Sequence, residues 1–474
     1  LAKGFNNFMQ KGGQLEEIKF GKFTLSTTKP NEVQDKLFNS LLNLTEIKTL
    51  TCENNNMFYS GFNGSKSIAK MILTHKNLSE INLKNVSLND SQAKDIADSL
   101  MRAKGLEILN LSSNTSLKPA GLTSVIYNLA FSPKLYYLDI SRIPITSDFS
   151  NLVEAIYKLL RISASLEVLN LSYCGSLNCN LPEQFFVALG EVRTLKKLDL
   201  SFSGSLNSTA CTNLGKAIAF NAKKFGSLEH INLDGNVISS YHNLTLMYEG
   251  MHISDADHES WYGDANKVSK MSGKDFAKTY YNNLKSLQVN GCALATNFDV
   301  HSWKKQYNPQ DPPFVKLIAR SKELTNLQLA RTNFSYKDAD ILALALDPTR
   351  AEFCSKVRIL NLSRNNLGKE GVKTLATIFE KNNIIEVLDI SHNQLGVAGA
   401  ISLAQALTNN KSLKYLNLFS NKIDVDGARA FEKTLKTNTS LEYIDFGHNR
   451  LRGEGLNAIA RGIAANKDSG IKHL

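Results

Sequence analysis

Cysteine is scarce in this chain. Its 474 residues include six cysteines, and no two of them form a C-x-x-C pair. This scattering predicts neither a disulfide framework nor a cysteine-based zinc site. We expect the thiols to be buried and free, and we expect a cytoplasmic location. The cysteines are Cys52, Cys174, Cys179, Cys211, Cys292 and Cys354.

Long apolar runs and catalytic motifs are missing as well. Hydrophobic residues make up 42% of the chain, but no run approaches the roughly 18 apolar residues of a membrane-spanning helix. The opening LAKGFNNFMQKGG has no apolar core of the kind found in signal peptides. No nucleophile motif, carboxylate pair or metal-ligand spacing stands out. The sequence therefore predicts no membrane span, no catalytic residue, no metal site and no cofactor.

Acidic residues are outnumbered, and the formal net charge is +11. A basic balance is a usual mark of nucleic-acid binding. Here, however, Lys369 and Lys433 stand beside Glu370 and Glu432 in stretches of helical spacing, which is typical of a solvated helix face. The sequence argues against nucleic acid as the partner. The same charge also suits an acidic protein surface such as tubulin.

The chain does contain a repeated phrase. VRILNLSRNNL, IEVLDISHNQL, LKYLNLFSNKI and LEYIDFGHNRL follow one another at a step of 28 residues. An asparagine closes each phrase, where its amide can pair with backbone groups left over at a strand end. A glycine recurs six residues later, where we expect it to allow tight backbone angles at a helix entrance. The two series are Asn365, Asn393, Asn421 and Asn449, and Gly371, Gly399, Gly427 and Gly455.

Each phrase predicts a short strand followed by a helix. In LKYLNLFSNKI, Leu413, Leu416 and Leu418 alternate with Tyr415 and Phe419, so the leucines face a core and the aromatic rings face outward. The stretch GARAFEKTLKTNTS has apolar residues at helical spacing. One such unit cannot bury its apolar face alone, so stability must come from stacking on its neighbours.

The same phrase recurs, more loosely, through almost the whole chain. Where the asparagine is replaced, for example by Cys174, Ser203, Cys292 or Thr332, the turn must satisfy its backbone in another way or bury an apolar group. The fourteen phrases begin at Leu15, Ile47, Leu78, Leu106, Leu135, Leu166, Leu195, Leu228, Leu284, Leu324, Val357, Ile385, Leu413 and Leu441.

With this pattern the chain resembles the ribonuclease-inhibitor-like subfamily of leucine-rich repeat proteins. The resemblance implies an α/β solenoid of about 14–15 repeats, a horseshoe with a parallel β-sheet on the concave face and helices on the convex face. It also implies a non-enzymatic scaffold that binds a protein partner, as a subunit of a larger cytoskeletal or ciliary assembly. Two alternatives share the architecture, a regulator of a small GTPase like the Ran GTPase-activating proteins and the recognition arm of an NLR-type receptor.

We expect residues 1–474 to form a single repeat domain. The final IKHL begins a fifteenth phrase, so we expect the chain to be a fragment of a longer protein. Two segments break the period. Residues 239–283 form either an insertion or a degenerate repeat, and residues 295–315 form a loop insertion.

Candidate partner-binding residues lie in two places. Aromatic and basic side chains from adjacent phrases are expected to meet on the concave face, because neighbouring strands lie only about 4.8 Å apart. A smaller group of this kind contains Tyr137, Tyr173 and Phe202. The predicted concave patch consists of Arg364, His392, Tyr415, Phe419, Tyr443 and His448, and the predicted insertion site consists of Tyr248, Trp261 and Tyr262.

Overall fold

The computed structural model of the chain describes residues 15–20, 41–42, 46–54, 64–145, 150–175, 177, 181–238, 241–253, 279–280, 283–292, 313–350 and 355–474. They divide into two compact units. Unit 1 contains the described residues up to Gly204 and Phe220–Leu228. Unit 2 contains Ser205–Ala219 and the described residues from Glu229 to Leu474.

The described residues form one parallel sheet of fourteen short strands in chain order. Each of the fourteen predicted phrases contains one of these strands, which confirms the predicted class of α/β repeat solenoid. Unit 1 holds β1 (Glu17–Lys19), β2 (Thr49–Thr51), β3 (Glu80–Asn82), β4 (Ile108–Asn110), β5 (Tyr137–Asp139), β6 (Val168–Asn170) and β7 (Lys197–Asp199). Unit 2 holds β8 (His230–Asn232), β11 (Ser286–Gln288), β12 (Asn326–Gln328), β13 (Ile359–Asn361), β14 (Val387–Asp389), β15 (Tyr415–Asn417) and β16 (Tyr443–Asp445).

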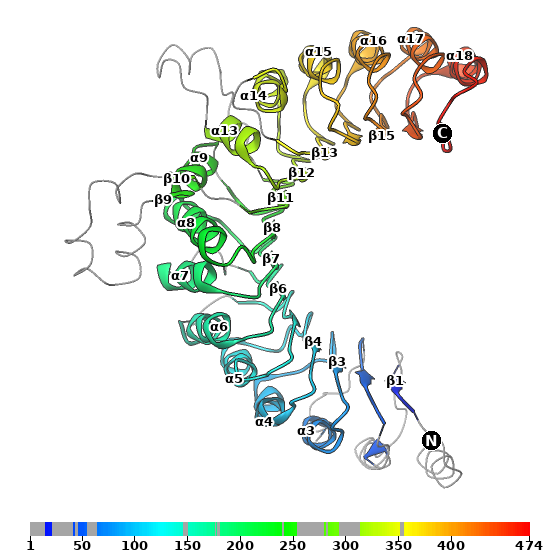
Figure 1. Cartoon of the computed structure of the whole chain (residues 1–474). Helices are drawn as coiled ribbons and strands as arrows, with labels where there is room; N and C mark the ends of the chain where they lie inside the picture. The colour runs from blue at the N-terminus through cyan, green and yellow to red at the C-terminus, as the bar shows by residue number, and fades with distance from the viewer. Residues whose placement is uncertain are drawn as a thin grey trace, which may run out of the picture. The chain divides into compact units, whose positions relative to one another are not determined.

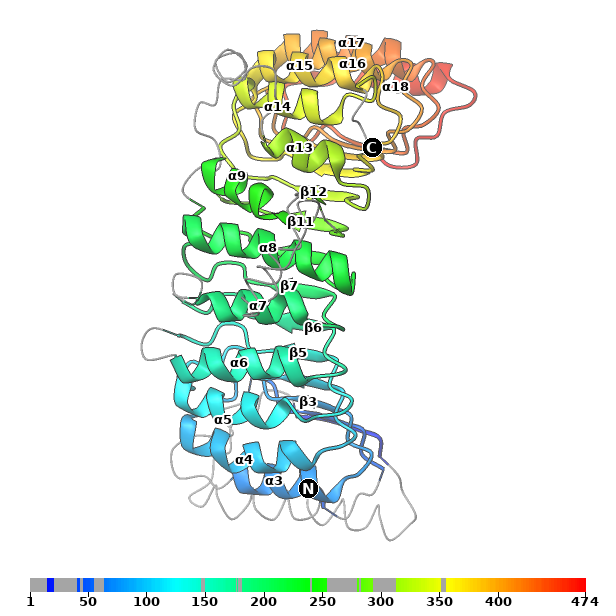
Figure 2. The same ribbon diagram turned by 60° about the vertical axis from the view of Figure 1, so that its left-hand side comes forward.

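Helices follow the strands and pack side by side along one face of each unit (Figures 1 and 2). No described helix or strand covers the other face, which we call the open face. Unit 1 has α3 (Gly64–Thr74), α4 (Asp90–Arg102), α5 (Pro119–Leu129), α6 (Ser150–Ile162) and α7 (Glu183–Glu191), and α8 (Ser208–Lys224) has residues in both units. Unit 2 has α9 (Tyr241–Gly250), α13 (Pro313–Arg320), α14 (Tyr336–Leu346), α15 (Gly368–Phe379), α16 (Gly396–Leu407), α17 (Val425–Leu435) and α18 (Arg452–Ala465).

The core lies between the strands and the helices. Leu413, Leu416 and Leu418 are fully buried, as their alternation predicts, and Phe431 of α17 likewise has no exposed surface. Tyr415, on the open face, is half-buried. None of the helices in the described ranges is long and apolar enough to cross a membrane.

The recurring asparagines tie consecutive repeats together. The Asn421 side-chain Nδ2 donates to the carbonyls of Leu418 at 3.1 Å and of Ile390, in the preceding repeat, at 2.9 Å. Its Oδ1 accepts the backbone N–H of Asn393 at 2.7 Å. Asn449 in turn accepts the N–H of Asn421 at 2.9 Å. The predicted pairing of side-chain amide with backbone is confirmed, and each amide serves two repeats.

Other residues take over this task where asparagine is absent. The Ser203 hydroxyl donates to the Leu171 carbonyl at 2.8 Å and accepts the N–H of Cys174 at 3.1 Å. The Cys174 thiol reaches the Ile140 carbonyl at 3.4 Å. A hydroxyl replaces both functions of the amide, whereas a thiol supplies only a weak donor.

The predicted reason for the glycine series is wrong. Gly427 does not adopt a left-handed conformation, but a Cβ placed on it would lie 2.6 Å from Cγ2 of Ile423 and 3.1 Å from Cβ of Ala400. The close approach of Ile423, in the turn before α17, and of Ala400, on the adjacent helix α16, is therefore what requires glycine there. Positive φ angles occur three residues before the series, at Gly368 and Gly396, with values of 60° and 61°.

A second row of buried amides was not predicted. The side chain of Asn410 donates to the carbonyls of Phe379 at 2.9 Å and Asn382 at 3.0 Å, and accepts the N–H of Leu413 at 2.8 Å. Asn410 thus links the end of the helix before it to the start of the next strand. The other asparagines of the row hold the same place in their repeats. The row has the same step of 28 residues as the phrase itself and consists of the buried Asn382, Asn410 and Asn438 and the half-buried Asn466.

The two segments that break the period are described only in part. β8 pairs directly with β11, and between them lie α9 and the antiparallel pair of β9 (His252–Ile253) and β10 (Thr279–Tyr280). The segment 295–315 lies outside the described residues except for its end, which belongs to α13.

Candidate functional site

The predicted concave patch lies on the open face of unit 2. We call Arg364, His392, Tyr415, Phe419, Tyr443 and His448 the aromatic patch. The repeat brings its members together, because β15 and β16 pair in register and place Tyr415 directly beside Tyr443. The two rings stack with centroids 4.2 Å apart and planes 4° apart.

The tyrosine pair lies near the carboxylates of Asp389 and Asp445. Partial burial raises the pKa of Tyr415 to about 12, and a hydrogen bond with Tyr443 and the nearby Asp389 and Asp445 act in the same direction. The Tyr415 hydroxyl therefore stays protonated at neutral pH and remains available as a donor and an acceptor. The pair offers a flat apolar face with polar tips.

A second row of rings runs beside the tyrosines. Phe419 lies between two histidines, with ring centroids 5.3 Å from His392 and 4.6 Å from His448. Gly447 makes this possible, because a Cβ there would lie 2.8 Å from Cδ2 of Phe419. Partial burial, with the positive charge of Arg364 next in weight, lowers the pKa of His392. His392 is therefore mostly uncharged at neutral pH, although it is bordered by arginine.

The charged and histidine side chains of the patch stand at turns of left-handed backbone. Arg364, His392 and His448 have φ angles of 56°, 56° and 53°. Such a conformation costs a non-glycine residue about 1 kcal/mol or more, so it persists only where the surrounding turn determines it. Because the repeats of the patch have the same turn, these side chains form a row along the ends of the strands. Arg331, with φ 55°, extends the row and was not singled out from the sequence, although it holds the same place in its phrase as Arg364.

Unit 1 carries a shorter row of the same design. The rings of Tyr173 and Phe202 stack at 4.4 Å with planes 11° apart, and the Arg142 guanidinium lies 4.1 Å from the centre of the Tyr173 ring. All three residues have positive φ angles. Tyr173 and Phe202 are 39% and 45% exposed, so the pair is a real apolar surface. Tyr137, which the sequence grouped with them, lies on β5 and interacts with Asp139 instead.

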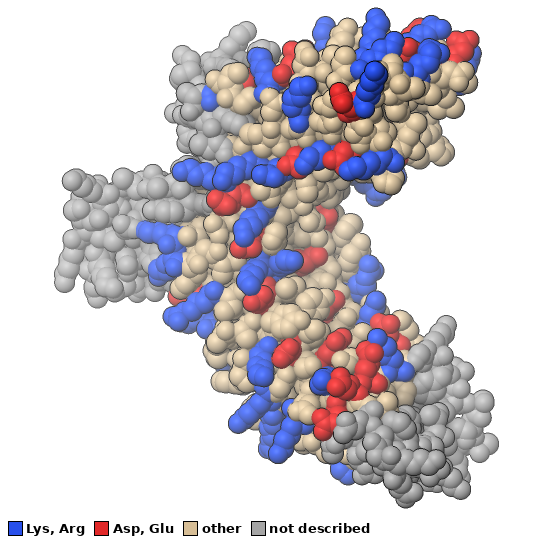
Figure 3. Space-filling view, turned by 45° about the vertical axis from the view of Figure 1, so that its right-hand side comes forward, with Lys and Arg blue, Asp and Glu red and all other residues tan. Residues whose placement is uncertain are grey.

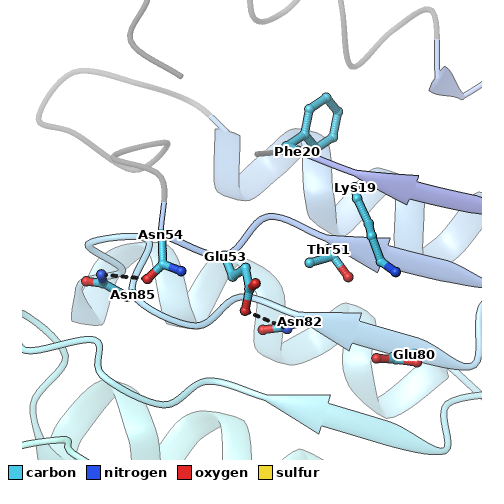
Figure 4. A pocket seen from close by; sticks show the side chains of 8 residues that line it. All are labelled: Lys19, Phe20, Thr51, Glu53, Asn54, Glu80, Asn82 and Asn85. Atoms are coloured by element: carbon cyan, nitrogen blue, oxygen red, sulfur yellow. Dashed lines mark hydrogen bonds between the residues drawn. The ribbon is translucent and has the colours of Figure 1, made fainter. Parts of the chain in front are cut away.

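The open face at the N-terminal end of unit 1 is polar. A pocket of about 660 Å³ is bordered by β1, β2 and β3 (Figure 4). Glu53 accepts a hydrogen bond from Asn82 at 3.4 Å, and Asn85 donates to Asn54 at 3.0 Å. Acidic side chains gather beside this end of the face in Figure 3. The pocket thus offers oxygen acceptors, with Lys19 and a single aromatic ring, Phe20, among its lining residues.

The predicted insertion site falls outside the part that can be described. Trp261 and Tyr262 lie outside the described residues, and Tyr248 lies in α9 with a side chain that is not described. Within the described ranges, no three His, Cys, Asp or Glu side chains are placed to hold a metal ion. The cysteines described there are free and buried, and burial raises the pKa of Cys174 to about 12.

Comparison with known proteins supports the repeat assignment for the C-terminal part. Residues 353–376, 381–404, 409–431 and 437–460 match the family model described as Leucine Rich repeat. These segments are leucine-rich repeats. They include the residues of the aromatic patch.

Two solved structures are similar to the chain. One is the yeast Rad7 and Elc1 complex, with 14% identity, a TM-score of 0.41, and coverage of 100% of this chain and 91% of the other. The second is human 5T4, a trophoblast glycoprotein also named Wnt-activated inhibitory factor 1, with 19% identity, a TM-score of 0.35, and coverage of 58% and 78%. At these TM-scores neither likeness supports a conclusion about function. No curated protein matches the chain.

Proposed function

We propose that this chain is a non-enzymatic scaffold that binds a protein partner through the aromatic patch. Leucine-rich repeats generally mediate protein–protein interactions and typically have no catalytic role. The observation that carries the proposal is the contact between rings of successive repeats, the Tyr415–Tyr443 stack and the Phe419 row. Aromatic side chains bordered by arginine are enriched in the cores of protein interfaces.

The partner that suits the patch has both apolar and acidic groups. An apolar side chain fits the faces of Tyr415 and Phe419, and a carboxylate fits the rim formed by Arg331 and Arg364. The rings are already held by their neighbours, so they lose little conformational freedom when the partner binds. An acidic protein surface such as tubulin, in a cytoskeletal or ciliary assembly, is one partner of this kind.

Three finer features belong to the same proposal. We propose that the chain is of the ribonuclease-inhibitor-like subfamily, which its strand–helix repeat supports. The buried free thiols suit a cytoplasmic protein. Residues 239–283, including Tyr248, Trp261 and Tyr262, are an insertion that adds selectivity. The direct pairing of β8 with β11 favours an insertion over a degenerate repeat.

The test is affinity capture from native lysate with crosslinking mass spectrometry. The wild-type chain is compared with Tyr415→Ala/Phe419→Ala/Tyr443→Ala. We expect a partner that crosslinks near β15 and β16 and is lost from the variant. The matched control is Tyr336→Ala/Leu456→Ala, which removes two side chains, 52% and 57% exposed, from helices of unit 2.

Either of two results would contradict the proposal. One is unchanged capture by the triple variant. The second is an equal loss of capture by the control, which would mean that exposed apolar surface in general, and not the aromatic patch, retains the partner.

A further inference from the structure

The edge of unit 1 where its helices end has a surface unlike that of the open face. Its strands are parallel, so each helix runs back and ends at the same edge, where the next strand starts (Figure 2). We call this the helix-end edge. Large apolar side chains stand out from it, each 38–54% exposed. They are Leu73, Met101, Tyr127, Phe131, Tyr136, Ile162 and Phe225.

Cations are spread along the same edge. Each helix from α3 to α8, or the turn that follows it, contributes an exposed Lys or Arg. One from each repeat is Lys76, Arg102, Lys134, Arg161, Arg193 and Lys224. Glu191, an acidic residue of this edge, is paired with Arg161 at 3.2 Å. The edge therefore combines positive charge with protruding apolar groups over six successive repeats.

The two kinds of side chain are in contact. Nζ of Lys158 lies 4.6 Å from the centre of the Tyr127 ring, and the Phe131 ring lies 6.5 Å from that of Tyr127. The Arg193 guanidinium lies 5.7 Å from the centre of the Phe225 ring. Because the cations lie against the rings, the charged and the apolar side chains project to a similar distance from the protein surface.

A hollow of about 430 Å³ opens at the ends of α6, α7 and α8. Arg161, Arg193 and Lys224 line it together with Glu191, Ile162 and Phe225. Three cations against one carboxylate leave the hollow positive, which suits a phosphate, and the two apolar side chains suit the first carbons of an acyl chain.

We propose that the helix-end edge of unit 1 binds the surface of an anionic phospholipid membrane. An acidic protein would be held by the cations alone and would gain little from isolated apolar side chains on an open edge. A lipid surface uses both, because apolar side chains enter the boundary between headgroups and acyl chains while Lys and Arg attract the anionic headgroups. The binding is peripheral and involves a surface separate from the aromatic patch.

Vesicle cosedimentation of the full chain tests this proposal. We expect binding to phosphatidylcholine vesicles that contain phosphatidylserine, weaker binding at high salt, and little binding to pure phosphatidylcholine. Arg161→Gln/Arg193→Gln/Lys224→Gln should weaken binding at least tenfold, since each Lys or Arg near an anionic surface contributes roughly fivefold. The control, Lys369→Gln/Lys373→Gln/Lys433→Gln, removes the same charge from helices of unit 2.

A second variant tests the apolar part. Phe131→Trp places an indole on the exposed edge. When phosphatidylserine vesicles are added, the fluorescence of this variant should shift further to the blue than that of the wild-type chain, which has two tryptophans of its own. Absence of binding to anionic vesicles would overturn the proposal, and so would an equal loss in the unit 2 control. Binding without a fluorescence shift would show attraction by charge alone and would refute insertion of the edge. Circular dichroism melting of each variant confirms that its fold is intact.

Discussion

Replacing Asn421 with alanine tests whether the shared amides hold the repeats together. The substitution removes the oxygen that accepts the N–H of Asn393 at 2.7 Å, inside a fully buried turn. The carbonyls of Ile390 and Leu418 lose one donor each but keep another, from Asn393 at 3.2 Å and Asn449 at 2.9 Å. One orphaned N–H and two lost hydrogen bonds together predict a loss of about 2–5 kcal/mol in the free energy of unfolding.

Urea unfolding followed by circular dichroism gives the size of the loss, and hydrogen exchange of the Asn393 amide gives its place. Asn421→Ser should lose about half as much, because Ser203 in the equivalent turn accepts the N–H of Cys174. Asn366→Ala, at an exposed turn position, should change stability by less than about 0.5 kcal/mol. The reasoning fails if Asn421→Ala is no worse than Asn366→Ala, or if serine and alanine are equivalent.

Three further predictions concern other parts of the fold. Gly427→Ala should destabilise unit 2 by about 1–3 kcal/mol in urea unfolding, because the new Cβ would lie 2.6 Å from Cγ2 of Ile423. Gly453→Ala, with open space around it, should be neutral or stabilising by up to about 1 kcal/mol. Burial lowers the pKa of His75, whose ring nitrogens make no hydrogen bond to the described residues, although the nearby Leu41 backbone opposes the shift. The unfolded chain therefore takes up the proton at a higher pH than the folded chain, so the melting temperature should fall as the pH drops below about 6.5. His75→Phe should reduce this pH dependence, and an unchanged dependence in the variant would contradict the prediction. Because burial raises the pKa of Cys174 to about 12, iodoacetamide at pH 8 should label it in urea but hardly in the native protein, as peptide mass spectrometry would show.

The repeat made much of this structure predictable. The alternation in LKYLNLFSNKI determines which side chains are buried, and the constant step places Tyr415 beside Tyr443. A single period therefore carries both local and tertiary information, because neighbours in space are also one step apart in sequence. The fourteen strand positions follow from the same argument.

What the period does not encode is the geometry around it. The sequence marks Gly427 but does not show whether backbone angle or packing requires glycine there, and only the approach of Ile423 decides. The left-handed turns of His392 and His448 give only a weak signal, because histidine is enriched in that conformation but seldom adopts it. The angle between neighbouring rings depends on side-chain rotamers, which are set by packing against the next repeat. Asn410, by contrast, shares the step and was detectable.

The shared amides give the array a direction. The oxygen of each asparagine accepts a backbone N–H from the repeat before it, as Asn449 does for Asn421 and Asn421 does for Asn393. A repeat therefore completes the turn of its predecessor. During synthesis on the ribosome, the turn at Asn393 stays without its acceptor until the chain has grown by another 28 residues, to Asn421. Order should thus advance along the nascent chain one repeat behind its growing end.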